Sequence, residues 1–543
     1  MIDFIVDHSP ALIVAIPLIG AFLTPLIGKI NDKLRNIFVI LVVAFNAFLI
    51  GLLINKVATT GSIVTYVFGG TDRVVEGSQY AIRILFEVDG LNAFIALIAA
   101  ILPLVAVIYS WGFMKEETGQ DKYYTLILLM TAGMLGMILT GDLFNFFVFL
   151  EIASIASCAL IAFRTDNKFS VQAGFKYIVI SAIGALFVLF AIAIFYSQYN
   201  ALNMAVIANS ITYGTLDRIA LVILIAALAM KAGLAPMHMW IPDAYGRSPA
   251  PVTVVLVGAT LAGLYGGLRV IFTIFGKQLE YVLNHVKIEI EAIEFLYEFD
   301  ITINMVVGIL IMVLAILSIV LGVFMALKRS DFKKMIAYAA VAEIGYMFLA
   351  IGAYLLTVSS VEDHMKAAGI YALQGGLFHI LNDALDVGLL LLVAGAVYYA
   401  TKQTSLNKLG GLARNMKYTT IFFLIGLVAI SGMPPLNGFA SKLMIYQSTY
   451  EISPILSIVA ILCSIMLLAV FAKVFQSIFL GPEIPSLKNV KEVPKSMLIA
   501  MGIVACIIIF IGLFPNLVLE SVVVPAADAI QNTTSYISAV IGG

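Results

Sequence analysis

Long apolar runs constrain the fold of this chain more than any other feature of its sequence. Fourteen stretches come close to or exceed the ~20 residues that an α-helix needs to cross a hydrocarbon core about 30 Å thick. They lie approximately at 9–29, 36–56, 90–113, 123–141, 143–163, 170–196, 216–236, 250–275, 302–328, 333–357, 369–399, 417–447, 453–480 and 494–520. Charged residues make up 12% of the chain, against about 25% in soluble domains. The sequence therefore predicts an all-α polytopic membrane protein with about 14 transmembrane helices.

The distribution of basic residues predicts how these spans are oriented. Alternate loops on one side hold 20 of the 31 Lys and Arg residues, whereas the loops on the other side hold seven. Because positive charge is retained in the cytoplasm, both termini are predicted to lie outside the cell membrane. The first span follows Asp3 and Asp7 instead of a basic segment, so we expect a retained helix and not a signal peptide. The net charge of −1 gives no indication of a nucleic-acid partner.

The cysteines give no indication of a redox or metal centre. Cys158, Cys463 and Cys506 stand singly inside apolar runs, without the spacing that holds zinc or an iron–sulfur cluster. We therefore expect no cofactor and no metal in this chain, and interpret these residues as small apolar core residues.

Two segments on the outer side are longer than turns. The segment 57–89 includes the alternating residues 81–88, which predict a short strand or hairpin. The segment 277–300 mixes acidic and apolar residues, which suits either a position along the membrane surface or a docking site for a partner.

Ionisable residues inside the apolar runs are the strongest functional signal. A charged side chain near the bilayer centre costs about 2.5–3.5 kcal/mol, so it persists where a partner or a function holds it. Glu151 lies near the middle of the fifth run, LFNFFVFLEIASIASCALI. Lys231 and Lys442 lie in the seventh and twelfth runs, each beside prolines that open the helix, as at the ion sites of many transporters. A Glu151–Lys231 pair would offset both desolvation costs, whereas Arg269 and Lys473, near the ends of runs, are expected to reach the interface.

The tenth and eleventh runs add a second polar group. His379, Asp383 and Asp386 stand four and seven residues apart, so they share one face of a helix. We predict that they exchange protons or ions. Glu343, about ten residues into the tenth run, and Lys333, at its start, are additional candidates, although basic residues are expected at a cytoplasmic helix end for reasons of topology alone.

Three stretches of the chain resemble one known family. They are MKAGLAPMHMWIPDAYGRSPAPVTVVL from Met230, LKRSDFKKMIAYAAVAEIGYM from Leu327 and SGMPPLNGFASKLMIY from Ser431. They are similar to the antiporter-like subunits, a family that joins the D-type subunits of Mrp cation/proton antiporters, the proton-pumping subunits of respiratory complex I (NADH–quinone oxidoreductase) and subunits of membrane-bound hydrogenase-type complexes. The resemblance extends over nearly the whole chain.

The resemblance implies a division of the chain. Two inverted five-helix repeats, 123–275 and 302–480, would each contain one broken helix, in the seventh and twelfth spans. A three-helix segment, 1–113, would precede them, and 494–543 would form a C-terminal helix and tail.

The resemblance also implies roles for particular residues. The family's essential glutamate falls on Glu151, its lysine in the seventh span on Lys231, and its terminal lysine or glutamate in the twelfth span on Lys442. His238, within the first of the three stretches, is a further candidate for the relay.

The sequence departs from the family at two central positions. The lysines that are common in the eighth and eleventh spans are replaced by Leu261 and Val387. Either His379, Asp383 and Asp386 replace these lysines together with water, or the path is altered or interrupted, or it carries another ion such as sodium.

These features predict a proton- or cation-translocating subunit of a multisubunit membrane complex. The complex would be an Mrp-type antiporter or a redox-driven relative, with other membrane subunits as partners, H⁺ or Na⁺ as the ion and no covalent chemistry in this chain. Two alternatives stay open: a stand-alone secondary transporter of a small solute, and a structural subunit that translocates nothing.

Overall fold

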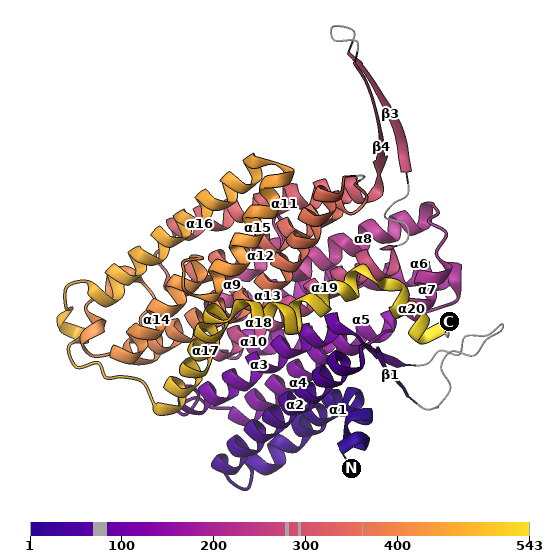
Figure 1. Cartoon of the computed structure of the whole chain (residues 1–543). Helices are drawn as coiled ribbons and strands as arrows, with labels where there is room; N and C mark the ends of the chain where they lie inside the picture. Colours follow the sequence, from indigo (N-terminus) through magenta and orange to yellow (C-terminus); the bar gives the residue numbers. More distant parts are fainter. Residues whose placement is uncertain (1, 69–83, 277–281, 291–294, 361, 542–543) are drawn as a thin grey trace.

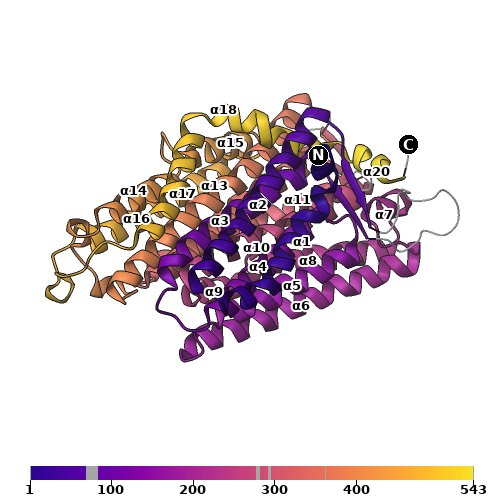
Figure 2. The same ribbon diagram turned by 90° about the horizontal axis from the view of Figure 1, so that it is seen from below.

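Helices account for almost all of the described structure. The structure is a computed structural model that describes residues 2–68, 84–276, 282–290, 295–360 and 362–541. Its α-helices are α1 (Ile2–Gly28), α2 (Asp32–Thr60), α3 (Gly90–Phe113), α4 (Gln120–Leu139), α5 (Leu143–Ile161), α6 (Lys168–Tyr199), α7 (Met204–Ser210), α8 (Thr215–Ala232), α9 (Ile241–Arg247), α10 (Ala250–Leu268), α11 (Ile303–Lys328), α12 (Phe332–Thr357), α13 (Asp363–Thr401), α14 (Lys417–Ile430), α15 (Asn437–Ile452), α16 (Pro454–Phe475), α17 (Lys495–Leu513), α18 (Pro515–Val518), α19 (Val524–Gln531) and α20 (Thr533–Ile541). The long helices run side by side in one bundle (Figures 1 and 2).

The described part of the chain contains 13 helical segments that are long and apolar enough to cross a membrane. They coincide with all of the predicted runs but one. The remaining run, 417–447, is divided into α14 and α15 by the non-helical residues 431–436. The prediction of an all-α polytopic membrane protein is confirmed, and the twelfth span is interrupted where Pro434 and Pro435 stand.

The seventh span is interrupted in a similar way. Helix α8 ends at Ala232, and a 3₁₀ turn at Met237–Trp240 leads into α9. Gly233 follows α8 with φ +79°, and Gly432 follows α14 with φ +66°, a left-handed conformation that favours glycine. A Cβ at Gly432 would also lie 2.8 Å from Cδ of Lys442, so the break and the lysine are closely packed.

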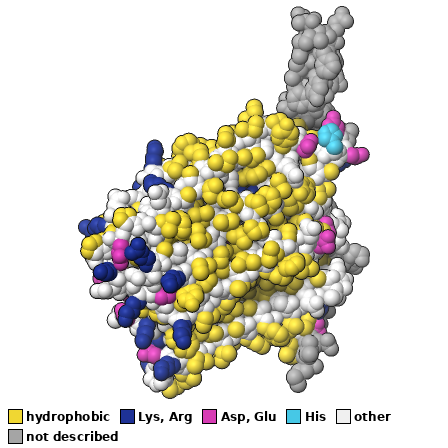
Figure 3. Space-filling model, turned by 60° about the vertical axis from the view of Figure 1, so that its left-hand side comes forward, with side chains coloured by type: hydrophobic (Ala, Val, Ile, Leu, Met, Phe, Trp, Pro, Cys, Tyr) yellow, Lys and Arg dark blue, Asp and Glu magenta, His cyan; other side chains and the backbone are white. Residues whose placement is uncertain are grey.

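The bundle has a buried centre and an apolar surface. Nearly every residue of α10, of α12 and of residues 372–397 in α13 is buried, and α13 packs against α10, α12, α14 and α15. The outer helices expose large apolar side chains, among them Phe22, Phe175 and Ile455. Figure 3 shows such side chains covering much of the surface, with Lys and Arg gathered at one end. An apolar surface this extensive suits contact with lipid.

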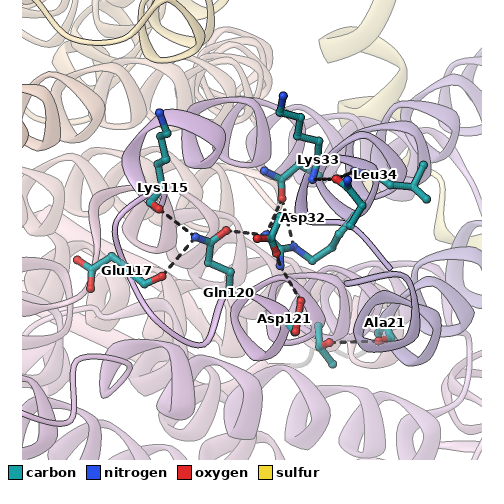
Figure 4. A network of polar contacts seen from close by, with 12 residues as sticks. Ala21, Asp32, Lys33, Leu34, Lys115, Glu117, Gln120 and Asp121 are labelled. Atoms are coloured by element: carbon teal, nitrogen blue, oxygen red, sulfur yellow. Dashed lines mark hydrogen bonds and ion pairs between the residues drawn. The ribbon is translucent and has the colours of Figure 1, made fainter. Parts of the chain in front are cut away.

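A polar network at the basic end ties α2 to α4 (Figure 4). The Arg35 guanidinium, which is almost completely buried, contacts Asp32 and Asp121 at 2.7 Å each. It also donates to Oε1 of Gln120 at 2.5 Å, and Gln120 donates in turn to the carbonyl of Glu117. These contacts fix the N-terminal pair of helices against the rest of the bundle.

The two ends of the described chain lie at the other end of the bundle. Strands β1 (Val64–Val67) and β2 (Leu85–Val88) form an antiparallel hairpin there, which confirms the strand predicted at 81–88 as far as the described residues extend. His8 lies 3.2 Å from the Tyr66 hydroxyl of β1, Phe86 of β2 bridges to Thr140 after α4, and α20 packs against α7. Which side of the membrane this end faces stays a prediction.

The second long outer segment also forms strands. Strands β3 (Val282–Ile290) and β4 (Phe295–Thr302) pair in antiparallel fashion, and the ribbon extends away from the helices (Figure 1). Whether 277–300 lies along the membrane surface or docks a partner stays a prediction. Residues 277–281 and 291–294 of this segment lie outside the described part of the chain.

Candidate functional site

The centre of the candidate site is a buried group of three ionisable side chains from three helices. Glu343 of α12 contacts Lys442 of α15 through Oε1 at 2.8 Å and His379 of α13 through Oε2 at 2.9 Å. All three residues are about 1% exposed. One carboxylate thus lies between two basic groups in the interior of the bundle.

Lys442 has two further contacts that fix its position. Its ammonium donates a hydrogen bond of 2.8 Å to the carbonyl of Ile430, at the end of α14, and lies 4.6 Å from the ring centre of Tyr346. The last carbonyls of a helix have no partner within the helix and carry its negative dipole end. The ammonium therefore satisfies a carbonyl that the helix break exposes.

Two aspartates extend the group along α13. Asp386 accepts a hydrogen bond of 3.0 Å from the Asn437 amide, and Asp383 has a buried Oδ1 without a hydrogen-bond partner among the described residues. Ser441 of α15 lies 3.2 Å from Nδ1 of His379. The structure therefore brings the predicted residues of the eleventh span into one cluster with Lys442. We call Glu343, His379, Asp383, Asp386 and Lys442 the acidic cluster.

The second candidate site surrounds Lys231 at the end of α8. Its ammonium donates to the hydroxyls of Ser154, at 2.8 Å, and Ser181. Tyr177 joins these residues in the wall of a cavity of about 30 Å³. The ammonium is therefore held by neutral hydroxyl groups next to a space of the size of a water molecule.

Glu151 is close to Lys231 but does not touch it. The two charges are within electrostatic range of each other, yet the described residues include no ion pair between them. Oε1 of Glu151 is buried and has no hydrogen-bond partner in the described part of the chain. The predicted Glu151–Lys231 pair is thus present as neighbouring charges and not as a direct contact.

The two sites have the same components in the same order. Glu151 and Glu343 lie in the fifth and tenth spans, and Lys231 and Lys442 lie beside the breaks of the seventh and twelfth. The two sites differ in one respect: Glu343 and Lys442 form a direct ion pair, whereas Glu151 and Lys231 do not touch.

Two of the additional candidates lie outside both sites. Lys333 donates hydrogen bonds to the carbonyl of Ser248 at 2.6 Å and to the hydroxyl of Thr253 at 3.3 Å. His238 lies half-buried in the 3₁₀ turn after α8, and its Nδ1 has no hydrogen-bond partner among the described residues. The structure therefore does not bring Lys333 or His238 into contact with the relay residues.

Arg269 is buried against residues at one end of the bundle. Its guanidinium is about 1% exposed, contacts Asp89 and Asn92, and lies 4.5 Å from the ring centre of Tyr536 in α20. Glu87 of β2 lies near this guanidinium. Burial raises the pKa of Glu87 well above its usual value, although the positive charge of Arg269 lowers that pKa. Arg269 is held by a partner 180 residues away along the chain, and its position relative to the membrane interface stays a prediction.

Sequence reasoning missed the hydroxyl and amide groups that hold the ionisable ones. Ser154 lies three residues after Glu151, a helical spacing that was available as a signal. Ser181, Asn437 and Ser441 come from other helices, and no local pattern marks them. Among the described residues, no group of three or more His, Cys, Asp or Glu is arranged to hold a metal ion.

Comparison with protein families identifies the lineage. Residues 140–290 and 289–468 match the family described as NADH:quinone oxidoreductase/Mrp antiporter, TM. The chain belongs to this family. Residues 75–124 also match the N-terminal family of chain 5 of NADH-ubiquinone oxidoreductase (complex I). The resemblance drawn from the three sequence stretches is thereby confirmed.

Individual NADH:quinone oxidoreductase/Mrp antiporter family members resemble the chain along almost its full length. The N-type subunit of the NADH-quinone oxidoreductase of Desulforudis audaxviator is 28% identical over 95% of this chain and 98% of its own. The D-type subunit of the Na(+)/H(+) antiporter of Bacillus subtilis is 28% identical over 97% of this chain and 98% of its own. A chain in the structure of the membrane-bound sulfane sulfur reductase, an archaeal respiratory membrane complex, superposes with a TM-score of 0.82 at 26% identity, covering 98% of this chain and 100% of its own.

Proposed function

We propose that this chain is the proton- or cation-translocating subunit of a multisubunit membrane complex. The observation that carries the proposal is the pair of glutamate–lysine sites inside the bundle, at two helix breaks, with a histidine and two aspartates beside one of them. Relatives are named as subunits of a Na⁺/H⁺ antiporter and of an NADH-quinone oxidoreductase, which supports H⁺ and Na⁺ as ions and other membrane subunits as partners.

The proposed route begins at Lys231 and ends at Lys442. A proton that enters from the cytoplasm reaches Lys231, and the neighbouring charge of Glu151 changes how strongly that lysine holds it. The ion then passes laterally to the acidic cluster and leaves beside Lys442. His238 and Lys333 have no contact with this route in the structure, and we propose no step for them.

The acidic cluster suits a site that binds and releases a cation. Lys442 balances the charge of Glu343, and burying further negative charge on Asp383 or Asp386 requires a proton or a cation nearby. The same carboxyl groups could accept H⁺ or Na⁺, so the choice of ion depends on the complex in which the chain works.

The predicted organisation remains part of this proposal. We propose that 123–275 and 302–480 are inverted repeats, since each contains a glutamate span followed by a broken lysine span. We also propose that the basic end of the bundle faces the cytoplasm, which places both termini outside.

The proposal is tested by separate Glu151→Ala and Lys231→Ala variants in the complete complex, reconstituted in vesicles. Each variant is expected to assemble with its partner subunits and to lose ion movement, measured with a pH-sensitive dye and with ²²Na⁺. Lys473→Ala is the matched control, because Lys473 is an exposed lysine of α16. Full ion movement by both variants would refute the proposal.

The volume of the cavity beside Lys231 favours ion translocation over the alternative of a stand-alone solute transporter. A volume of about 30 Å³ accommodates a water molecule and is too small for an organic solute. Uptake of a solute by the purified single chain would favour the transporter. Unchanged ion movement after substitution at both lysines would favour a structural subunit.

A further inference from the structure

The route between the two sites lacks a basic group at the two central positions where the sequence departs from the family. Leu261 of α10 is about 2% exposed, and Val387 of α13 is completely buried. Neither side chain can donate or accept a proton. Any lateral transfer from Lys231 to the acidic cluster must therefore use other polar groups.

Tyr245 of α9 and Thr260 of α10 form a buried hydroxyl pair. Their oxygens lie 2.9 Å apart, and the two residues are about 1% and 4% exposed. The Thr260 hydroxyl also lies 2.9 Å from the carbonyl of Leu256, so its proton has two acceptors to choose from. A hydroxyl group both donates and accepts, which is the requirement for a group that passes a proton on.

Thr260 reaches the Lys231 site. It lines the cavity of about 30 Å³ together with Lys231, Ser154 and Ser181. A cavity holds a water molecule when it offers about 10–15 Å³ of accessible volume and two to four polar partners. Water in this cavity would lie between the ammonium and the Thr260 hydroxyl.

Tyr245 is close enough to the acidic cluster to interact electrostatically with it. Asp383 lies within electrostatic range of its hydroxyl, and Oδ1 of Asp383 is buried without a hydrogen-bond partner among the described residues. The ring of Trp240 packs edge-on against Tyr245 with centres 6.2 Å apart, and α9 packs against α12, which carries Glu343. Packing against Trp240 thus fixes the Tyr245 ring while its hydroxyl contacts Thr260.

We propose that Tyr245 and Thr260 are the bridge that passes protons between the Lys231 site and Asp383. This inference rests on the proposed function. The Lys231 ammonium gives a proton to water in its cavity, and that water gives one of its own protons to Oγ1 of Thr260 while the proton of that hydroxyl passes to Oη of Tyr245. The proton of Tyr245 passes to a carboxylate oxygen of Asp383, so each hydroxyl keeps one proton and neither residue stays charged.

The test removes one hydroxyl at a time from the complete complex in vesicles. Tyr245→Phe and Thr260→Val are expected to reduce proton movement roughly a hundredfold, the order of a lost proton-transfer group. Thr260→Ser keeps the hydroxyl and is expected to retain most of the activity, which a merely structural role for Thr260 would not require. Tyr109→Phe is the matched control, because Tyr109 is a completely buried tyrosine that donates to the Leu392 carbonyl, away from both sites.

The outcomes separate this inference from the function on which it rests. Full proton movement by Tyr245→Phe and Thr260→Val, together with its loss in Lys231→Ala, would overturn the bridge and leave the proposed function intact. Equal loss in Thr260→Ser and Thr260→Val would also overturn it, since the hydroxyl would then not matter. Full movement in Lys231→Ala as well would refute the proposed function itself.

Discussion

Replacing Glu343 by glutamine tests the acidic cluster most directly, because it removes one charge and almost no volume. The contact of 2.8 Å with the Lys442 ammonium corresponds to about 6 kcal/mol of attraction at an effective dielectric constant of about 20. Part of this is recovered by hydrogen bonds of the new amide. Removing one partner of a buried ion pair typically costs about 3–5 kcal/mol, since the other charge stays buried and uncompensated. We expect Glu343→Gln to lower the stability of the subunit by about 3–5 kcal/mol and to abolish ion movement.

A double variant separates stability from transport. Glu343→Gln combined with Lys442→Met removes both charges, and replacing a buried ion pair by neutral groups is often neutral or stabilising. The melting temperature of the purified complex should therefore fall in the single variant and recover in the double variant. Ion movement in vesicles should be absent from both. Glu451→Gln, at an exposed glutamate of α15, is the control and should change neither quantity.

The same pair of measurements gives the result that would refute this reasoning. If Glu343→Gln melts at the temperature of the unsubstituted complex, Glu343 does not compensate a buried ammonium. If the double variant still moves ions, the acidic cluster is not part of the route.

Three further predictions concern residues around the sites. Gly432→Ala places a Cβ 2.8 Å from the Lys442 side chain at a left-handed backbone position, so it should impair ion movement, whereas Gly51→Ala, with open space around it, should not. Burial raises the pKa of Glu87 in the folded chain, so the folded state favours its protonated form. The contribution of Glu87 to stability is therefore greatest at low pH and falls as the pH rises toward the raised pKa. Glu87→Gln should raise the melting temperature at alkaline pH and less so near pH 4. Asp142→Ala removes the carboxylate that caps α5 by accepting a hydrogen bond of 2.7 Å from the backbone N–H of Asn145, and should cost about 1 kcal/mol of stability in thermal unfolding.

Much of the fold could be predicted because the membrane requires it. Every span needs about 20 apolar residues, and this requirement marked all 13 spanning segments of the described chain, while the prolines marked the break at 431–436. The strands β3 and β4 escaped prediction, although residues 286–291 and 297–302 alternate apolar and polar side chains with the period of a strand. Residues outside the spans do not have to meet this requirement for apolar length, so their structure is harder to predict from sequence.

The sequence could predict only those parts of the site whose residues lie on the same helix. Spacing along the eleventh run placed His379, Asp383 and Asp386 on one face, and the structure brings that face to Lys442. The sequence could not rank Glu343 above its neighbours, because its importance comes from α13 and α15, which meet it in space. The buried partner of Arg269 could not be predicted for the same reason, as Asp89 lies far away along the chain.

Lys442 is held by two oxygens of different kinds, the Glu343 carboxylate and the Ile430 carbonyl. A lysine that has given up its proton attracts a carboxylate far less, and its side chain has less reason to stay at the end of α14. The carbonyl then needs another donor, which water or a neighbouring side chain can supply. If water supplies it, discharging the lysine also wets the end of the half-helix, so the exit side of the proposed route would be dry while the lysine is charged and wet once it is neutral.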